Sequence, residues 1–143
     1  MTANPVDHAG LEVLPFDECL RLLATVPVGR VGFFAAGEVV MLPVNHAVDG
    51  SNVVFRTDNG SKLAHLSDMF LVGFEADSYN EDAETGWSVV ITGRADIVDS
   101  DTEISQLDQL GLRPWGDAGR PYWIRIRPTS VTGRRTVASV PAG

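Results

Sequence analysis

The residues best suited to chemistry lie in a short segment around the only lysine of the sequence. Lys62 directly follows Ser61, and Arg56 and Thr57 lie a short distance upstream, where a strand-like run breaks at an Asn-Gly dipeptide. A guanidinium fork, an ammonium group, two hydroxyls and the free N–H groups of a helix start are groups that bind a phosphate monoester. We therefore interpret this segment as a phosphate clamp.

The same segment has a plainer interpretation. An Asn-Gly pair is a strong signal for a type I′ hairpin turn, and Ser61 can serve simply as a helix N-cap, which would leave Lys62 in solvent. The residues after Lys62 favour a helix over a strand, which weakens the hairpin. The spacing alone leaves the clamp and the N-cap open.

Composition limits the class of protein and its partners. The chain has 143 residues and 44% hydrophobic residues, enough for one domain that buries roughly two-thirds of its unfolded surface. Its net charge of −8 repels nucleic acid and anionic membranes, so we expect neither as a partner. Cys19 is the only cysteine and is expected to be a small buried residue of the first helix. With no targeting signal and no apolar run near ~18 residues, we expect a cytoplasmic protein.

The apolar pattern predicts mostly strands. They are expected over 29–35, 39–47, 52–57, 70–76, 87–98, 122–127 and 131–137, the last two being split by Pro128. Helices are expected from Phe16 to before Pro27, with Phe16, Leu20 and Leu23 on the buried face, over 61–67, and over 101–110 behind a Ser100 cap. Residues 77–85 are expected to form an acidic loop.

These elements predict a mainly β fold. Six to seven short strands with few helices favour an antiparallel sheet closed into a barrel, because closure removes exposed edges. We expect a flexible N-terminal arm over 1–13, one domain over 14–137 and a C-terminal tail over 138–143.

Several short segments, each weakly informative alone, occur in a characteristic order and spacing. They are Val28-Gly29-Arg30-Val31-Gly32-Phe33, Met41-Leu42-Pro43-Val44-Asn45-His46, Phe55-Arg56-Thr57, Gly60-Ser61-Lys62-Leu63, Phe74-Glu75-Ala76-Asp77, Thr85-Gly86-Trp87-Ser88-Val89, Gly93-Arg94-Ala95 and Val131-Thr132-Gly133-Arg134-Arg135. Over residues 14–137 the chain resembles the pyridoxamine 5′-phosphate oxidase-like family of flavin-binding split β-barrels, and it is most similar to the short actinobacterial-type members.

The resemblance implies a homodimer that binds FMN in a groove between the protomers. The residues that match the phosphate-binding positions are Arg56, Thr57, Ser61 and Lys62. The strand implied to run along the isoalloxazine ring carries Pro43, Val44, Asn45 and His46. Trp87 and Ser88 are implied to approach the flavin from the partner protomer. By residue type alone, Trp87 is equally explained as a core or interface aromatic, and His46 as a structural histidine.

Two arginines near the C-terminal end alternate on a strand, so only one of them can face a given groove. We expect one of Arg134 and Arg135 to reach a ligand or an acidic neighbour and the other to be solvated.

The function that follows from the resemblance is a flavin-dependent oxidoreductase, with hydride transfer through flavin N5 to or from an unidentified small molecule. No catalytic side chain stands out, because the cofactor would supply the chemistry, and one cysteine cannot build a thiolate metal site. Two alternatives stay open. One is a reductase that uses the deazaflavin F420, bound in a groove of Arg125, Arg127, Arg134 and Arg135. The other is a flavin-binding or flavin-storing dimer without turnover.

Overall fold

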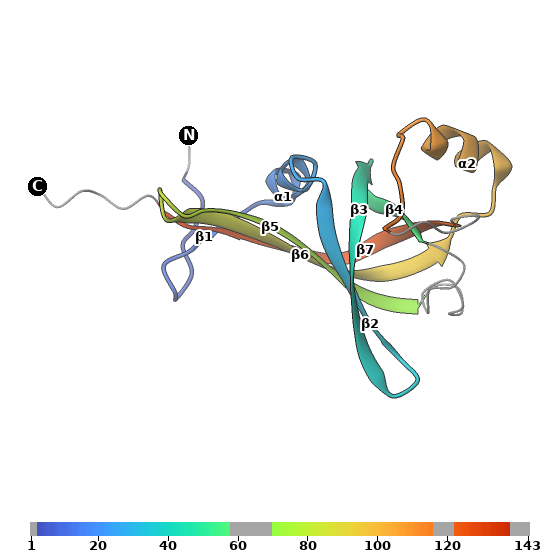
Figure 1. Ribbon diagram of the computed structural model, residues 1–143. Helices are drawn as coiled ribbons and strands as arrows, with labels where there is room; N and C mark the ends of the chain where they lie inside the picture. The colour runs from blue at the N-terminus through green and yellow to red at the C-terminus, as the bar shows by residue number, and fades with distance from the viewer. Residues whose placement is uncertain (1–2, 58–69, 116–121, 138–143) are drawn as a thin grey trace, which may run out of the picture.

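The polypeptide forms one antiparallel sheet whose edges meet. The computed structural model describes residues 3–57, 70–115 and 122–137. The strand order is β1-β7-β4-β3-β2-β5-β6, and β6 also pairs with β7, which closes the sheet (Figure 1). The mainly β, antiparallel barrel predicted from the sequence is confirmed.

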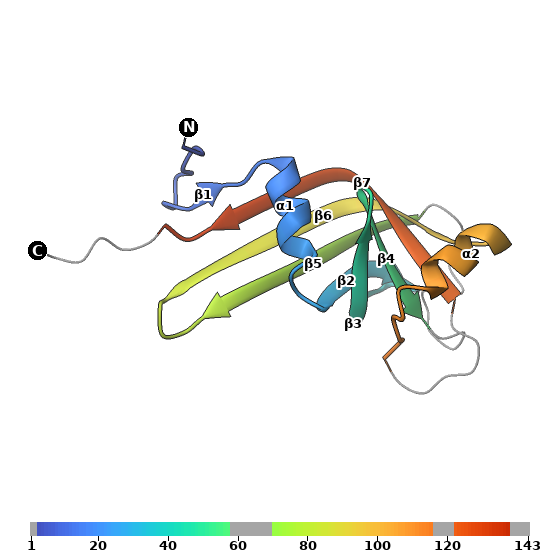
Figure 2. The ribbon, with the colours of Figure 1, turned by 90° about the horizontal axis from the view of Figure 1, so that it is seen from above.

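The elements follow the chain in a simple order. They are β1 (Glu12–Val13), α1 (Phe16–Leu23), β2 (Val28–Ala35), β3 (Glu38–Asp49), β4 (Asn52–Thr57), β5 (Phe70–Asn80), β6 (Thr85–Ile97), α2 (Asp101–Asp108) and β7 (Tyr122–Arg135). Figure 2 shows α1 lying across the sheet and α2 at the end of the molecule away from the two termini. The helix predicted over 61–67 lies outside the described residues. No helix in the described part of the chain is long and apolar enough to cross a membrane.

The helix α1 packs against the barrel core with residues that are spaced three and four apart. Cys19, Leu22 and Leu23 are buried, and Cys19 is wholly inaccessible. Phe16, predicted on the buried face, is 51% exposed; it is the first residue of α1. The helix also passes so close to β7 that a Cβ at Gly133 would lie 2.5 Å from Cys19 Sγ. This close approach requires a glycine.

The helix α2 has the cap that the sequence predicts. The Ser100 hydroxyl accepts a hydrogen bond from the Glu103 N–H at 3.4 Å. Leu107 is buried against Val54 of β4 and Trp123 of β7 in a second, smaller apolar cluster. The helix therefore covers the outer face of these two strands.

The prediction of an acidic loop over 77–85 is wrong for most of these residues. The strand β5 continues to Asn80, and β6 begins at Thr85, so only residues 81–84 form the turn. The side chains of residues 77–80 are all exposed, which removes the apolar alternation on which the strand prediction depends. Their backbones still pair with β6, as in Asp77 with Ser88.

The break predicted at Pro128 is also absent. The strand β7 is continuous, and a shift in its register with β6 falls beside this proline, since Thr92 pairs with Ser130 and Gly93 with Pro128. The extra residue, Thr129, donates its hydroxyl hydrogen bond to the Thr92 carbonyl at 3.1 Å. A bulge is one of the few places in a sheet that accepts a proline.

The described part of the N-terminal segment differs from the loose arm expected for residues 1–13. Glu12 and Val13 form a short strand, β1, against the end of β7. The N–H of Val13 donates to the Pro5 carbonyl at 2.7 Å, and the Asp7 carboxylate accepts from the backbone of Leu11 at 3.0 Å. The segment therefore folds back on itself and docks on the barrel.

Candidate functional site

The strands β3 and β4 separate at the residues that the sequence assigns to the cofactor. Their ladder ends at the pair of His46 and Phe55. In the same register the next pair would join Asn45 to Arg56, and it is not formed, although β4 stays paired with β7 up to its last residue, Thr57. The separation of the strands therefore begins between the predicted ring strand and the predicted phosphate clamp.

Beyond this point β3 has an open edge. Among the described strands, residues 38–45 pair only with β2. The His46 N–H points toward the β2 side, where the Pro27 carbonyl accepts it at 3.0 Å. Because backbone groups alternate along a strand, those of Asn45 and Pro43 face the open edge. Pro43 has no N–H to leave unpaired there, which is why proline suits an edge.

The side chains of this strand also alternate. Val44 and His46 are buried at 5% and 4% exposure, while Pro43 is exposed and Asn45 is half-buried. The Asn45 amide donates a hydrogen bond to the Arg113 carbonyl at 3.0 Å, which ties the segment after α2 to the open edge. Of the four ring-strand residues predicted, two present side chains to the surface.

His46 occupies a structural position. Its Nε2 lies 2.8 Å from the Leu23 carbonyl, and its ring packs edge-on against Phe74 with centroids 5.1 Å apart. A carbonyl only accepts hydrogen bonds, so Nε2 carries the proton. Burial lowers the pKa of His46, although the Leu23 carbonyl opposes this, and the imidazole stays neutral. It links the end of α1 to β3 and does not reach the open edge.

Arg56 contacts two residues of the fold, and one of its buried N–H groups has no acceptor in the described structure. Its guanidinium lies over the Trp123 ring, 5.1 Å from the centroid, and its Nη2 lies 3.9 Å from an Asp108 carboxylate oxygen. The same oxygen accepts from the Trp123 indole N–H at 2.7 Å. The Arg56 Nε is buried and has no hydrogen-bond partner in the described structure. Thr57 is buried, and Ser61 and Lys62 lie outside the described residues, so the structure describes half of the predicted clamp.

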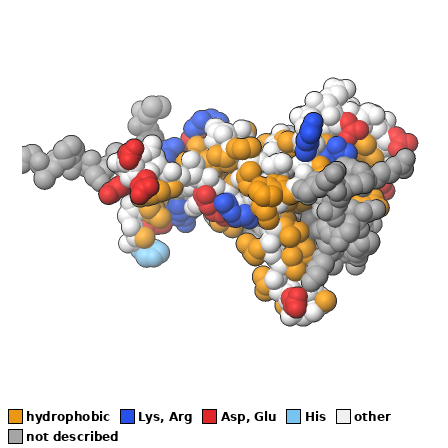
Figure 3. All heavy atoms as spheres, viewed as in Figure 1, with side chains coloured by type: hydrophobic (Ala, Val, Ile, Leu, Met, Phe, Trp, Pro, Cys, Tyr) orange, Lys and Arg blue, Asp and Glu red, His pale blue; other side chains and the backbone are white. Residues whose placement is uncertain are grey.

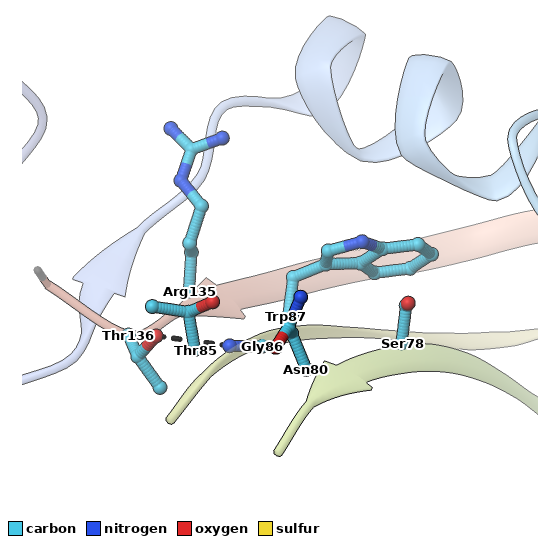
Figure 4. A pocket seen from close by; sticks show the side chains of 7 residues that line it. All are labelled: Ser78, Asn80, Thr85, Gly86, Trp87, Arg135 and Thr136. Carbon is cyan, nitrogen blue, oxygen red and sulfur yellow. Dashed lines mark hydrogen bonds between the residues drawn. The ribbon is translucent and has the colours of Figure 1, made fainter. Parts of the chain in front are cut away.

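Trp87 and Ser88 are successive residues of β6 and therefore face opposite sides of the sheet. Figure 4 shows Trp87 and Arg135 pointing to the same side, toward α1. They border a hollow of about 270 Å³ at the end of the sheet. Its lining residues are Ser78, Asn80, Thr85, Gly86, Trp87, Arg135 and Thr136. Ser88 borders a second hollow, of about 190 Å³, together with Arg134.

The two arginines at this end are both engaged by acids. Arg134 Nε lies 3.0 Å from Asp7, and Arg135 lies 3.0 Å from Glu12 and 3.1 Å from Glu18. The expectation that one of them is solvated is wrong. Asp7 and Glu12 were not predicted, because their segment was expected to be a loose arm and they lie 127 and 123 residues from their arginine partners in the sequence.

One protomer cannot bring all the predicted residues together. Trp87 pairs with Arg135 at the end of β7, whereas Arg56 pairs with Trp123 at its beginning. At ~3.3 Å per residue these two pairs lie roughly 40 Å apart along β7. Arg56 and Trp87 can contribute to one site only if a second copy of the chain supplies one of them.

The outer face of β2, β3 and β5 is unusually apolar. We call this surface the hairpin face, and its exposed apolar side chains are Phe34, Val39, Met41 and Leu71. Figure 3 shows hydrophobic side chains gathered over the β2–β3 hairpin. Gly32 and Gly73 are paired at its centre, where the absence of side chains leaves the backbone accessible.

A charged cluster borders the hairpin face. Arg30 lies 3.3 Å from Glu75 and 3.7 Å from Asp77. Desolvation, together with the neighbouring Asp77 carboxyl, raises the pKa of Glu75 to about 7, and Arg30 only partly opposes this. Near neutral pH the Glu75 carboxyl is therefore partly protonated.

The closed antiparallel sheet with its parted strands defines a split β-barrel. Residues 15–135 match the family described as pyridoxamine 5′-phosphate oxidase, and the chain belongs to this family. An uncharacterized protein of Mycobacterium tuberculosis, Rv0080, is 36% identical over 141 residues, which cover 95% of this chain and 92% of the relative.

Two solved structures resemble the chain along most of its length. The FAD binding protein from Mycobacterium smegmatis is 34% identical, with a TM-score of 0.75, and the match covers 87% of this chain and 99% of that protein. A protein of Corynebacterium glutamicum named for pyridoxamine 5′-phosphate oxidase is 36% identical, with a TM-score of 0.77 and coverage of 87% and 97%.

Proposed function

We propose that the protein is a flavin-binding oxidoreductase that holds FMN in a groove between the two protomers of a homodimer. The observation that carries the flavin part of the proposal is the similarity to the FAD binding protein of M. smegmatis, which the match spans almost completely at 34% identity. The choice of FMN rests on the phosphate clamp expected from the sequence. Family membership adds to it. When bound, the flavin supplies hydride transfer at N5 to or from a small molecule.

The described residues fit such a cofactor. A phosphate group binds to hydrogen-bond donors, and the buried Arg56 Nε is a donor without an acceptor in the described structure. A planar heteroaromatic ring with polar edges needs an unpaired backbone edge, which β3 provides at Pro43 and Asn45. In this proposal Thr57, Ser61 and Lys62 complete the phosphate contacts. Val44 and His46 fix the strand from within the core, and His46 has no direct contact with the ring.

The homodimer is supported by two features of the surface. The hairpin face exposes Phe34, Val39 and Met41 at 69%, 74% and 62%, and large apolar side chains exposed together mark an interaction surface. A second copy also resolves the separation of Arg56 from Trp87, because it can bring its own Trp87 and Ser88 to the clamp of the first protomer.

The arginine contacts favour FMN over F420. A polyanionic F420 tail would need the groove expected from Arg125, Arg127, Arg134 and Arg135. Arg134 and Arg135 are ion-paired, Arg127 lies 3.6 Å from Asp96, and Arg125 is buried beneath α2. Three of these arginines are therefore held by separate acidic partners, and Arg125 lies apart from them under α2.

The test is to identify the chromophore that the purified protein carries. We expect a yellow protein that releases FMN on denaturation, as separated by chromatography against FMN, FAD and F420 standards. Release of FAD would keep the flavin site and correct the nucleotide, whereas release of F420 would overturn the assignment. Bleaching of the flavin absorption by NADPH or NADH under anaerobic conditions supports an oxidoreductase. A bound flavin that neither donor reduces would favour the flavin-storing protein instead.

A further inference from the structure

A third hollow lies beside α2, separate from the proposed flavin groove. Its volume is about 160 Å³. The residues that line it are Asp49, Glu103, Gln106, Leu107, Leu110 and Arg125. They come from the end of β3, from α2 with the residues just after it, and from β7, three regions far apart in the sequence.

Arg125 is an unusual residue at the base of this hollow. It is 8% exposed and forms an ion pair with Glu103, whose carboxylate oxygen lies 3.5 Å from Nη1. Its Nε is buried and has no hydrogen-bond partner in the part of the chain that the structure describes. Buried donors are rarely left unmatched, because each lost hydrogen bond has an energetic cost. The Arg125 guanidinium therefore has donor capacity beyond its ion pair with Glu103, and a carboxylate in the hollow can accept from it.

The charges around the hollow restrict what can bind there. Arg125 contributes one positive charge, and Asp49 and Glu103 contribute negative ones. Asp96, the register neighbour of Arg125 on β6, is paired with Arg127. A simple anion would be repelled by the two lining carboxylates, and a simple cation by Arg125. A molecule that carries both charges matches both signs.

The remaining lining residues indicate the rest of the ligand. Leu107 is buried and Leu110 is 48% exposed, and together they form the smaller, apolar part of a mainly polar lining. We propose that this hollow binds a small α-amino acid with a short apolar side chain. Its carboxylate lies on Arg125, its ammonium group faces Asp49 and Glu103, and its side chain contacts the two leucines.

The test is a thermal shift measurement with three matched probes. L-Valine carries both charges, isovalerate lacks the ammonium group, and isobutylammonium lacks the carboxylate. We expect L-valine to raise the Tm of the full chain in a saturable manner and the other two to raise it much less. Equal shifts with all three probes, or no shift with L-valine, would overturn the proposal.

Variants of the hollow complete the test. Arg125→Lys keeps the charge but removes the fork, and Leu110→Trp fills the hollow from an exposed position without changing its charge. Both are expected to abolish the L-valine shift, measured against each variant's own Tm without ligand. Arg127→Lys, two residues along the same strand, should keep it. An L-valine shift that survives in Leu110→Trp would place the binding elsewhere and refute this site.

Discussion

At the scale of single residues, Arg56 shows how a predicted ligand contact can also be part of the fold. Its guanidinium is stacked on Trp123 and faces Asp108, so most of its charge is already used when no ligand is bound. Its Nε is buried and has no hydrogen-bond partner in the described structure. The proposed clamp therefore depends on Lys62 for a second positive charge.

Lys62→Ala tests this dependence. Losing a charge-assisted hydrogen bond of about 1.5–3 kcal/mol should weaken FMN binding about 10- to 150-fold. Riboflavin lacks the phosphate, so its affinity should not change. Fluorescence titration of both ligands measures the difference, with Arg127→Ala as the control for removing a surface cation. Equal FMN affinity in Lys62→Ala and wild type would show that the lysine is not a phosphate ligand.

Glu75 predicts a pH dependence of stability. The fold raises the pKa of its carboxyl from 4.5 to about 7, so the folded state holds this proton more tightly than the unfolded chain does. The free energy of unfolding should therefore fall as the pH rises from 4.5 to about 7. Urea unfolding across this range should show a smaller slope in Glu75→Gln than in wild type.

The control for Glu75→Gln is Glu81→Gln, which removes one charge from the exposed β5–β6 turn. An unchanged slope in Glu75→Gln would mean that the Glu75 carboxyl keeps its ordinary pKa in the folded protein.

At the scale of the elements, the contact between α1 and β7 depends on one glycine. Gly133→Ala should destabilise the fold by about 1–3 kcal/mol, because the added Cβ meets Cys19 Sγ and Leu14. Cys19→Ala removes the nearest of these atoms, so the double variant should lose less stability than the two single changes combined. Chemical denaturation of the four proteins gives the coupling energy. Additive losses would show that the two residues do not meet.

Elements that alternate or carry a cap were predictable from the sequence. The strands β2 and β4 and the capped α2 were predicted close to their observed positions, because burial on one face leaves a pattern in the sequence. The exposed end of β5 left no such pattern, and the bulge at Pro128 depends on the register of another strand. The separation of β3 from β4 could not be predicted from the sequence either, because the alternating pattern of a strand does not show where its pairing with a neighbour ends.

The candidate site was predictable only in part. Pro43, Asn45 and Arg56 lie where the two strands part, and their contacts with a flavin stay a prediction. The ring of His46 faces the core, as does the side chain of Val44 two residues earlier. The local sequence does not show whether the odd-numbered or the even-numbered residues of this strand face the core. The Asp108 carboxylate beside Arg56 is brought there by α2, far away in the sequence.

At the scale of the whole molecule, the hairpin face predicts the assembly. Met41→Glu places a charge in its centre, next to the paired Gly32 and Gly73. We expect this variant to sediment as a monomer and to lose FMN affinity, because the partner completes the site. Phe16→Glu introduces the same charge at a residue of α1 that is 51% exposed and should remain dimeric. A dimeric Met41→Glu protein would place the interface elsewhere.

Sharing of the site between protomers predicts complementation. Lys62→Ala impairs the clamp, and Trp87→Ala impairs the residue proposed to come from the partner. In a mixed dimer of these two variants, one site carries both defects and the other carries none. Mixing should therefore restore tight FMN binding to a fraction of the sites, as measured by titration. If mixing restores nothing, each protomer binds alone.

The most direct test of the flavin assignment is a calorimetric titration of the cofactor-free protein with FMN. We expect saturable binding at one FMN per protomer, with quenching of the flavin fluorescence and no comparable heat from F420. Binding of F420 in preference to FMN, or the absence of binding by both FMN and FAD, would contradict the flavin assignment.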